Sequence, residues 1–162
     1  MKIKNLVSFI LRNFIPKIPY PVITGVLKGK RFIFGSFSGS GGGIRVYINK
    51  SEQEQTKMYT EIVSSGNIIF DIGANVGYYS VIGSQLVGNM GKVFAFEPSV
   101  RNLSYLYRHI VINEITNVSI MPFACADTVS FSVFSTSENC ALGHLVTENT
   151  LENGILEYVD RK

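Results

Sequence analysis

The chain has 162 residues, of which 46% are hydrophobic and 17% charged, and its formal net charge at pH 7 is +3. This composition excludes a disordered or collagen-like chain, and the length predicts about one domain with a sizeable core. Two cysteines are too few for a disulfide scaffold, so we expect the reducing environment of the cytoplasm. No apolar run is long enough to predict a membrane-spanning helix.

The charge is unevenly distributed along the chain. Residues 1–60 contain ten Lys and Arg against two Glu, whereas the remaining residues have a net charge of −5. A solvated basic face is the simpler interpretation, and contact with an anionic partner is the alternative. We expect no nucleic-acid partner, because no nucleic-acid-binding motif accompanies the basic residues.

The first segment, residues 1–15, has apolar side chains at helical spacing and predicts an amphipathic helix. Arg12 interrupts the apolar run, which excludes a secretory signal peptide. Docking on the protein's own body is the favoured use of this helix. Weak contact with an anionic membrane surface is the alternative.

A β-hairpin is predicted next, from residues 31–37 and 44–48 with a glycine-rich loop at 38–43. The loop glycines precede neither a helix nor the Gly-Lys-Ser/Thr sequence of a phosphate-binding loop, so we expect only a flexible connection. The predicted helix and hairpin together form an N-terminal extension over residues 1–50. The main domain is expected over residues 51–162.

The main domain is predicted to begin with a helix. Ser51, followed three residues later by Glu54, has the spacing of a capping box. Met58, Ile62 and Val63 are expected to form the buried stripe of this helix.

From residue 67 onward, short apolar strands alternate with helices. We expect strands at 68–70, 92–97 and 118–124, with helices at 78–86 and from residue 99. This alternation predicts an α/β fold with a Rossmann-like, doubly wound parallel sheet whose strands are covered on both faces.

The alternation stops after Asp127, although residues 129–133 and 155–159 predict two more strands. The doubly wound sheet is therefore expected to be truncated after its third strand unit.

The most informative segment lies between the first strand and the following helix, where doubly wound sheets bind ligands. Gly73 permits a ligand to approach the backbone, and Gly77 permits the helix start to pack closely on the strand. Glu97 ends the next strand, where a carboxylate accepts hydrogen bonds from both hydroxyls of a ribose. Asp127, at the end of the third strand, is a candidate acceptor for an adenine amine or a cap for the following turn.

This segment does not match a dinucleotide site. Such a site needs G-x-G-x-x-G to hold a pyrophosphate, but aligned on Gly73 the second and third positions are Asn75 and Tyr78. An acidic residue, Asp71, stands two positions before the first glycine. The pattern suits a nucleoside ligand that carries an amino acid and a sulfonium in place of phosphates. Asn75 has the alternative role of bracing the loop through its amide.

Three parts of the sequence together resemble the FkbM family of S-adenosylmethionine-dependent methyltransferases. They are Asp71–Ser80 (DIGANVGYYS), Val93–Pro98 (VFAFEP), and the group Asn102, Leu106 and Asn113. The resemblance covers about residues 45–127. It implies a class I methyltransferase fold, S-adenosyl-L-methionine as cofactor, and methylation of a hydroxyl on a sugar or other natural product.

The resemblance also implies roles for individual residues. The methionine end of the cofactor is assigned to Gly73, Ala74, Asn75 and Gly77, and Asp71 is a further cofactor-binding residue. Glu97 is assigned to the ribose, Pro98 and Ser99 to the adenine ring, and Asp127 to the adenine amine.

The family continues with further strand and helix units that build the pocket for a small-molecule or glycan acceptor, and we find none after Asp127. We therefore assign no catalytic base and no metal ligand. A non-catalytic remnant, or a cofactor-binding subunit completed by a partner chain, remains the alternative to an enzyme. The family's fourth strand pairs with the first, so residues 67–72 are expected to form an exposed sheet edge that favours self-association.

Three further residues have expected positions without a catalytic assignment. His109 is expected on the exposed face of a helix, Cys125 in the core and Cys140 at the surface. His144 is a general base only if a pocket forms around it.

Overall fold

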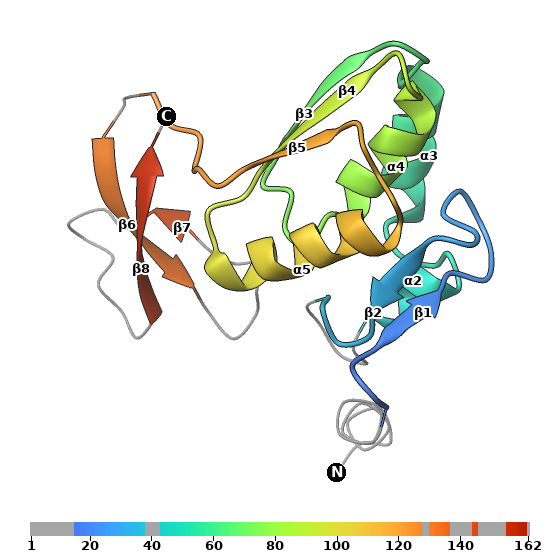
Figure 1. Ribbon diagram of the computed structural model, residues 1–162, viewed down its shortest axis with the longest axis horizontal. Helices are drawn as coiled ribbons and strands as arrows, with labels where there is room; N and C mark the ends of the chain where they lie inside the picture. Colours follow the sequence, from blue (N-terminus) through green and yellow to red (C-terminus); the bar gives the residue numbers. More distant parts are fainter. Residues whose placement is uncertain (1–14, 38–42, 128–129, 137–143, 146–154, 162) are drawn as a thin grey trace.

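A computed structural model describes residues 15–37, 43–127, 130–136, 144–145 and 155–161. Figure 1 shows an N-terminal hairpin with short helices, a parallel sheet with helices against it, and a separate antiparallel sheet near the C-terminus. The predicted helix over residues 1–15 lies outside the described residues, apart from Ile15. No helix in the described ranges has the length and apolar character needed to cross a membrane.

The parallel sheet contains β3 (Ile68–Ile72), β4 (Lys92–Phe96) and β5 (Val118–Met121), in that order. Helix α4 (Tyr78–Val87) connects the first two strands and α5 (Val100–Ile112) connects the second and third. Both strand pairs are parallel, with each strand beside its successor in the chain. The predicted Rossmann-like α/β fold is thus confirmed.

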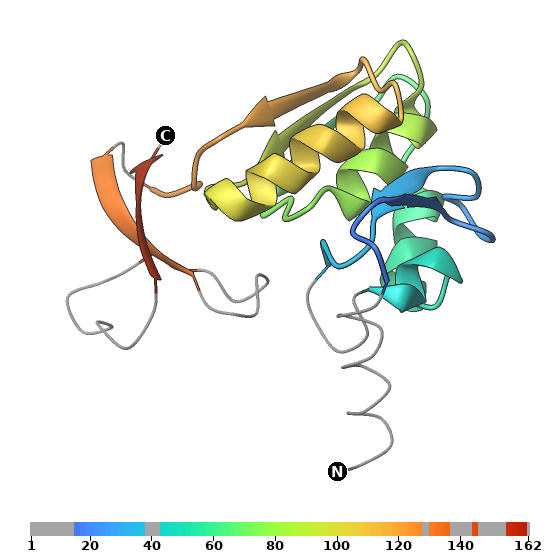
Figure 2. The same ribbon diagram turned by 60° about the horizontal axis from the view of Figure 1, so that its bottom comes forward.

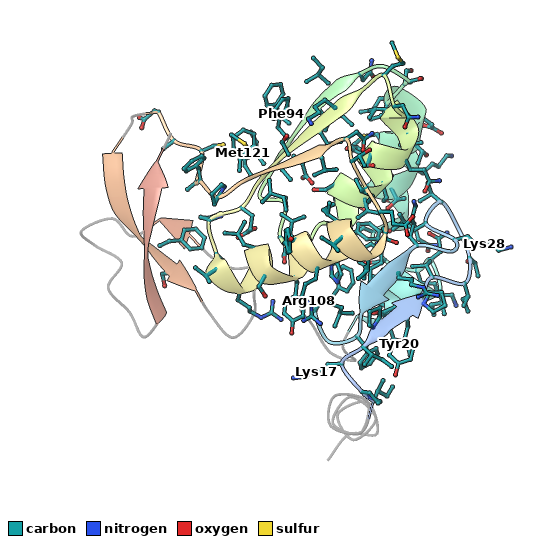
Figure 3. The ribbon with its side chains drawn as sticks, viewed as in Figure 1. Lys17, Tyr20, Lys28, Phe94, Arg108 and Met121 are labelled. Atoms are coloured by element: carbon teal, nitrogen blue, oxygen red, sulfur yellow. The ribbon has the colours of Figure 1, made fainter. Side chains whose placement is uncertain are left out.

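One face of this sheet is open, contrary to the prediction that its strands are covered on both sides. On the face toward the helices, Val93 and Ala95 are fully buried. On the other face, Ile68, Phe70 and Ile72 are each more than 60% exposed, and Phe94 and Met121 lie on the same side (Figure 3). The apolar run of β3 was misleading because an apolar strand sequence does not show what covers each face.

No described strand pairs with the second edge of β3, which is bonded to β4 alone among the described elements. The sheet edge expected at residues 67–72 is therefore present in the described part of the chain. Self-association through that edge remains a prediction.

The N-terminal part contains β1 (Pro19–Pro21) paired with β2 (Arg31–Ile33), followed by α2 (Ile44–Tyr47) and α3 (Gln53–Ile62). The predicted hairpin between residues 31–37 and 44–48 is therefore wrong. Strand β2 pairs with the segment that precedes it.

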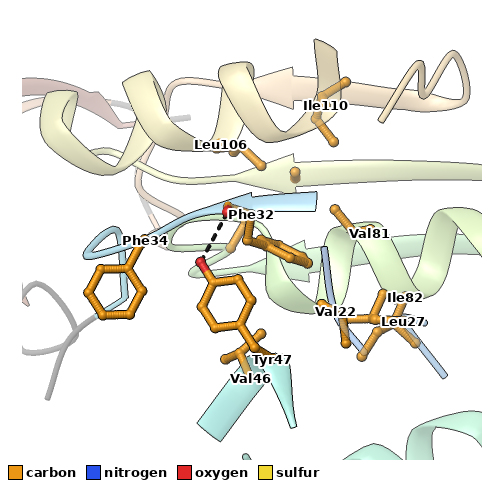
Figure 4. Packing of buried hydrophobic residues seen from close by; sticks show 12 residues of the cluster. Val22, Leu27, Phe32, Phe34, Val46, Tyr47, Val81, Ile82, Leu106 and Ile110 are labelled. Carbon is orange, nitrogen blue, oxygen red and sulfur yellow. Dashed lines mark hydrogen bonds between the residues drawn. The ribbon is translucent and has the colours of Figure 1, made fainter. Parts of the chain in front are cut away.

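A helical turn at residues 44–47 buries two adjacent side chains, Val46 and Tyr47, on the same side. A strand would point them in opposite directions. The Tyr47 hydroxyl also donates a hydrogen bond of 3.0 Å to the carbonyl of Phe32, which fixes this turn against β2 (Figure 4).

Helix α3 also differs from its prediction. Its N-cap is Glu52, with a left-handed φ of 43°, and no side chain forms a capping hydrogen bond. Ser51 therefore does not cap the helix. Its buried residue is Thr56, whereas Met58 and Ile62 are exposed. The helix contacts α4 through Thr56, whose hydroxyl lies 3.3 Å from that of Tyr78, and through the ring of Tyr59, which packs on Tyr79.

The C-terminal sheet is antiparallel and has the order β7 (His144–Leu145), β6 (Ser130–Thr136) and β8 (Ile155–Arg161). The strands predicted at 129–133 and 155–159 are confirmed within β6 and β8. Cys140 lies outside the described residues. Cys125, which we expected in the core, is exposed.

A single core joins the N-terminal part to the parallel sheet. Figure 4 shows Phe32 and Val22 from the hairpin region packed with Val81 and Leu106 from helices α4 and α5. Phe32, Val81 and Leu106 are fully buried. At roughly 25 cal/mol per Å² of buried apolar area, each such side chain contributes about 1.5–3 kcal/mol.

Helix α5 also holds β2 through polar contacts. The side-chain amide of Asn113 accepts a hydrogen bond from the Arg31 N–H (2.7 Å) and donates one to the Arg31 carbonyl (2.8 Å). Further along, Arg101 donates to the Ser36 carbonyl at 3.0 Å. Figure 2 shows the result, with α5 lying between the sheet and the β1–β2 hairpin.

Replacement of Asn113 tests the importance of this contact. We expect Asn113→Ala to lower the free energy of unfolding by about 1 kcal/mol, because the exposed hydrogen bonds to both backbone groups of Arg31 are replaced by bonds to water. Urea unfolding measures the change. Asn89→Ala, in an exposed turn, is the control and should stay within about 0.5 kcal/mol of wild type. Equal stabilities of the two variants would contradict the prediction.

Candidate functional site

The loop from β3 to α4, residues 73–77, has an unusual backbone. Gly73, Asn75 and Gly77 have φ angles of 78°, 52° and 92°. Left-handed φ values are readily accessible to glycine and tolerated by asparagine, which explains these residue types. A Cβ at Gly77 would lie 2.5 Å from Leu106 Cδ1, whereas a Cβ at Gly73 would meet no atom within 4 Å. The predicted close packing at Gly77 is therefore present, but its partner is α5.

The loop is bound to the end of β4 by its own amides. The N–H groups of Gly73 and Ala74 both donate to the Phe96 carbonyl at 2.9 Å, and that of Gly77 donates to the Ala74 carbonyl at 2.8 Å. The Asn75 N–H donates to Glu97 Oε2 at 2.8 Å. Four of the five loop amides thus have protein partners, which leaves few donors for a phosphate group.

Glu97 is only 4% exposed and is held by several donors. Besides the Asn75 N–H, its carboxylate accepts hydrogen bonds from the Ser99 N–H (2.9 Å) and the Asn102 side-chain amide (3.3 Å). Its carboxylate therefore braces the loop, a role that the sequence analysis missed. The ribose role assigned to Glu97 by resemblance remains a prediction.

Asp71 is the penultimate residue of β3, close to the loop. Burial raises the pKa of its carboxyl above the usual value, and hydrogen bonds from Ser80 partly offset this effect. The Ser80 hydroxyl donates to Asp71 Oδ2 at 2.5 Å. The hydroxyl and the backbone N–H of Ser80 carry no positive charge, so the Asp71 carboxyl can still bind a cationic or donor group of a ligand.

A cleft of about 440 Å³ opens over this loop, which is within the usual size range of small-molecule sites. Four predicted residues line it: Asp71, Gly73, Ala74 and Asn75. The other five predicted residues, Gly77, Glu97, Pro98, Ser99 and Asp127, are not among its lining residues. Pro98 is buried beside Glu97, and Asp127 is exposed.

The second wall of the cleft comes from the N-terminal part, which the sequence analysis did not assign to the site. Its members are Phe37, Gly43, Ile44, Arg45, Val46, Ser51 and Glu52. Val76 of the loop, with Tyr78 and Tyr79 of α4, completes the lining. No local pattern in residues 37–52 signals this role, because the segment meets the loop only through the tertiary packing.

The loop side of the cleft presents acceptor groups, whereas Arg45 and Tyr78 on the other walls can donate hydrogen bonds. Asn75 Oδ1 is buried and has no hydrogen-bond partner among the described residues. With the carboxylate of Asp71, it provides acceptors for an ammonium or hydroxyl group. The open space at Gly73 leaves room for a ligand against the backbone. In the described part of the chain, no three His, Cys, Asp or Glu side chains form a potential metal site.

His109 is fully buried, although we predicted it at the surface. Its Nε2 accepts a hydrogen bond from the Ile33 N–H at 3.0 Å, and its Nδ1 lies 2.6 Å from the Val76 carbonyl oxygen. Because Nε2 accepts a hydrogen bond and Nδ1 faces an acceptor, the ring is neutral with its proton on Nδ1. Helical periodicity alone could not reveal these partners, which lie 76 and 33 residues away in the sequence.

Burial lowers the pKa of His109 to about 4, and the charge of Arg108 acts in the same direction, while the hydrogen bond to Val76 opposes both. The unfolded chain, with an ordinary pKa near 6.5, therefore binds the proton more readily than the folded protein. This contribution to stability is complete above pH 6.5 and is lost as the pH falls toward 4.

We expect the wild type to lose about 3 kcal/mol of unfolding free energy through His109 between pH 7 and pH 4. Urea unfolding at a series of pH values measures this loss. His109→Gln is the control, since it has no titrating group there and should show a flatter pH dependence. Parallel curves for the two proteins would contradict the prediction.

The similarity of this chain to known proteins is a similarity of fold. No family model matches the chain, and no curated protein matches it. It is similar to a solved putative rRNA-methylase from Clostridium thermocellum, with 17% identity and a TM-score of 0.43 over 44% of this chain and 39% of that one.

Two other solved structures are also similar. A SAM dependent methyltransferase from Aquifex aeolicus has 22% identity and a TM-score of 0.38, over 44% of this chain and 37% of that one. A protein-L-isoaspartate O-methyltransferase has 21% identity and a TM-score of 0.46, over 54% and 33%. The chain thus spans less than two fifths of the length of each of these three structures.

Proposed function

We propose that this chain binds S-adenosyl-L-methionine in the cleft above residues 73–77, as the cofactor-binding part of a methyltransferase of the FkbM type. The observation that carries the proposal is the pairing of the loop amides with protein acceptors. A phosphate-binding loop needs free amides, whereas this loop presents acceptor atoms and an open backbone at Gly73. This favours a ligand with ammonium and hydroxyl donors.

The residues present fit this cofactor at its amino-acid end. Asp71 and Asn75 supply acceptors for the ammonium group, and Gly73 gives the ligand room beside the backbone. The roles of Glu97, Pro98, Ser99 and Asp127 toward the ribose and adenine rest on the family resemblance. Occupied by three protein donors, Glu97 has limited remaining acceptor capacity for a ribose hydroxyl.

The reaction we propose is methylation of a hydroxyl on a sugar or other natural product. When bound, the cofactor supplies an electrophilic methyl group on its sulfonium. Methylation of a hydroxyl would also require a base that accepts the hydroxyl proton. We place a small-molecule or glycan acceptor against the N-terminal wall of the cleft, formed by Phe37 and residues 43–46. No residue is assigned as the base.

A pair of glycine variants tests cofactor binding. Gly73 and Gly66 both have left-handed φ angles, 78° and 83°, and a Cβ at either would meet no atom within 4 Å. Only Gly73 lines the cleft. We expect Gly73→Ala to weaken the binding of S-adenosylhomocysteine at least about tenfold, because the added methyl group occupies ligand space. Isothermal titration calorimetry measures the affinity.

The matched control, Gly66→Ala, should bind like wild type while losing a similar amount of stability, about 1–2 kcal/mol. Both variants have the same backbone strain, so the comparison separates loss of ligand space from loss of stability. Equal affinities of the two variants would overturn the placement of the cofactor. A wild-type protein that binds NAD but not S-adenosylhomocysteine would overturn the proposed function.

A further inference from the structure

We propose that His109 is a positioning residue that holds the two walls of the cleft at a set separation, through an imidazole ring protonated on Nδ1. The ring bonds the cofactor loop on one side and the N-terminal part on the other. The effect of His109 on cofactor binding rests on the proposed function, whereas its role in holding the two walls together does not depend on that function.

The contact with the loop is made at its most constrained point. Val76, whose carbonyl faces Nδ1 at 2.6 Å, lies between Asn75 and Gly77, which both have left-handed φ angles. Val76 is itself 1% exposed. Its carbonyl belongs to the same peptide group as the Gly77 N–H, which donates to the Ala74 carbonyl at 2.8 Å. His109 therefore acts on the peptide groups that shape the cleft.

The contact with the N-terminal wall has two parts. Nε2 accepts the N–H of Ile33, the last residue of β2. The ring also stacks on Phe37, with centroids 6.2 Å apart and planes 15° from parallel. Phe37 lines the cleft. The same ring therefore positions the wall through a backbone hydrogen bond and through a stacked side chain.

Only one form of the ring satisfies both hydrogen bonds. The Ile33 N–H is a donor, so Nε2 must be unprotonated, and the Val76 carbonyl is an acceptor, so Nδ1 must carry the proton. Loss of either bond would leave a buried backbone group without its partner. Because the ring is fully buried, water does not replace a lost partner without local opening.

Two substitutions separate the two hydrogen bonds. An asparagine amide nitrogen lies two bonds from Cβ, like Nδ1, so His109→Asn retains a donor for Val76 and loses the acceptor for Ile33. A glutamine amide oxygen lies three bonds from Cβ, like Nε2, so His109→Gln retains the acceptor for Ile33 and loses the donor for Val76. Both remove the ring that stacks on Phe37.

We expect the two variants to lose stability to a similar degree and to differ in cofactor affinity. His109→Gln should weaken binding of S-adenosylhomocysteine by about tenfold, the equivalent of one hydrogen bond, whereas His109→Asn should stay within about threefold of wild type. A purely structural role would lower both affinities in proportion to stability. Affinities that follow stability alone would overturn the proposal.

Amide hydrogen exchange provides a test without ligand. The Asn75 and Gly77 amides should exchange faster in His109→Gln than in His109→Asn, because only the first loses the bond to the loop. Equal exchange in the two variants would overturn the positioning role. If wild type fails to bind S-adenosylhomocysteine but the exchange rates differ as expected, the proposed function fails and the positioning role stands.

Nitrogen-15 NMR of the wild-type imidazole keeps the proposal testable if neither variant folds. We expect Nδ1 to be protonated and Nε2 unprotonated at neutral pH, as both hydrogen bonds require. A ring protonated on Nε2, or on both nitrogens, would overturn the proposal.

Discussion

The structure depends on the polar inner side of helix α5. Asn102, His109 and Asn113 lie at spacings of seven and four residues, which places them on one side of the helix. Asn102 contacts Glu97 at the end of β4, His109 contacts both the loop and β2, and Asn113 contacts the start of β2. Asn102 and His109 satisfy groups that would otherwise be buried without partners, a state that costs about 1–3 kcal/mol for each group, and Asn113 adds exposed hydrogen bonds to Arg31.

This arrangement explains how a loop with three left-handed residues keeps one shape. Strained backbone conformations of this kind persist only where many surrounding contacts hold them in place. Here Phe96 and Glu97 hold the loop amides from one side, and Val76 is held by α5 from the other. The loop amides are directed into the protein. The loop side of the cleft consequently offers the acceptors of Asp71 and Asn75 and an open backbone at Gly73.

Within the described residues, the N-terminal part forms one packed unit with the site. It shares the hydrophobic core with α4 and α5, and it supplies one wall of the cleft. The sheet differs in character, since no described strand pairs with the second edge of β3, whose apolar side chains are exposed on the face away from the helices. The most extensively packed and hydrogen-bonded part of the molecule is thus the layer between the hairpin and the sheet.

The sequence alone determined the order of the parallel sheet's strands and helices, the position of the glycine loop and the location of Glu97 at a strand end. These features follow from local periodicity and from the backbone freedom of glycine, which are visible within a few residues. Only the tertiary structure decided that residues 44–47 form a helix, that His109 is buried and that Phe37 and Arg45 line the cleft. Each of these depends on partners distant in the sequence, and the burial of a side chain is set by those partners rather than by its own neighbours.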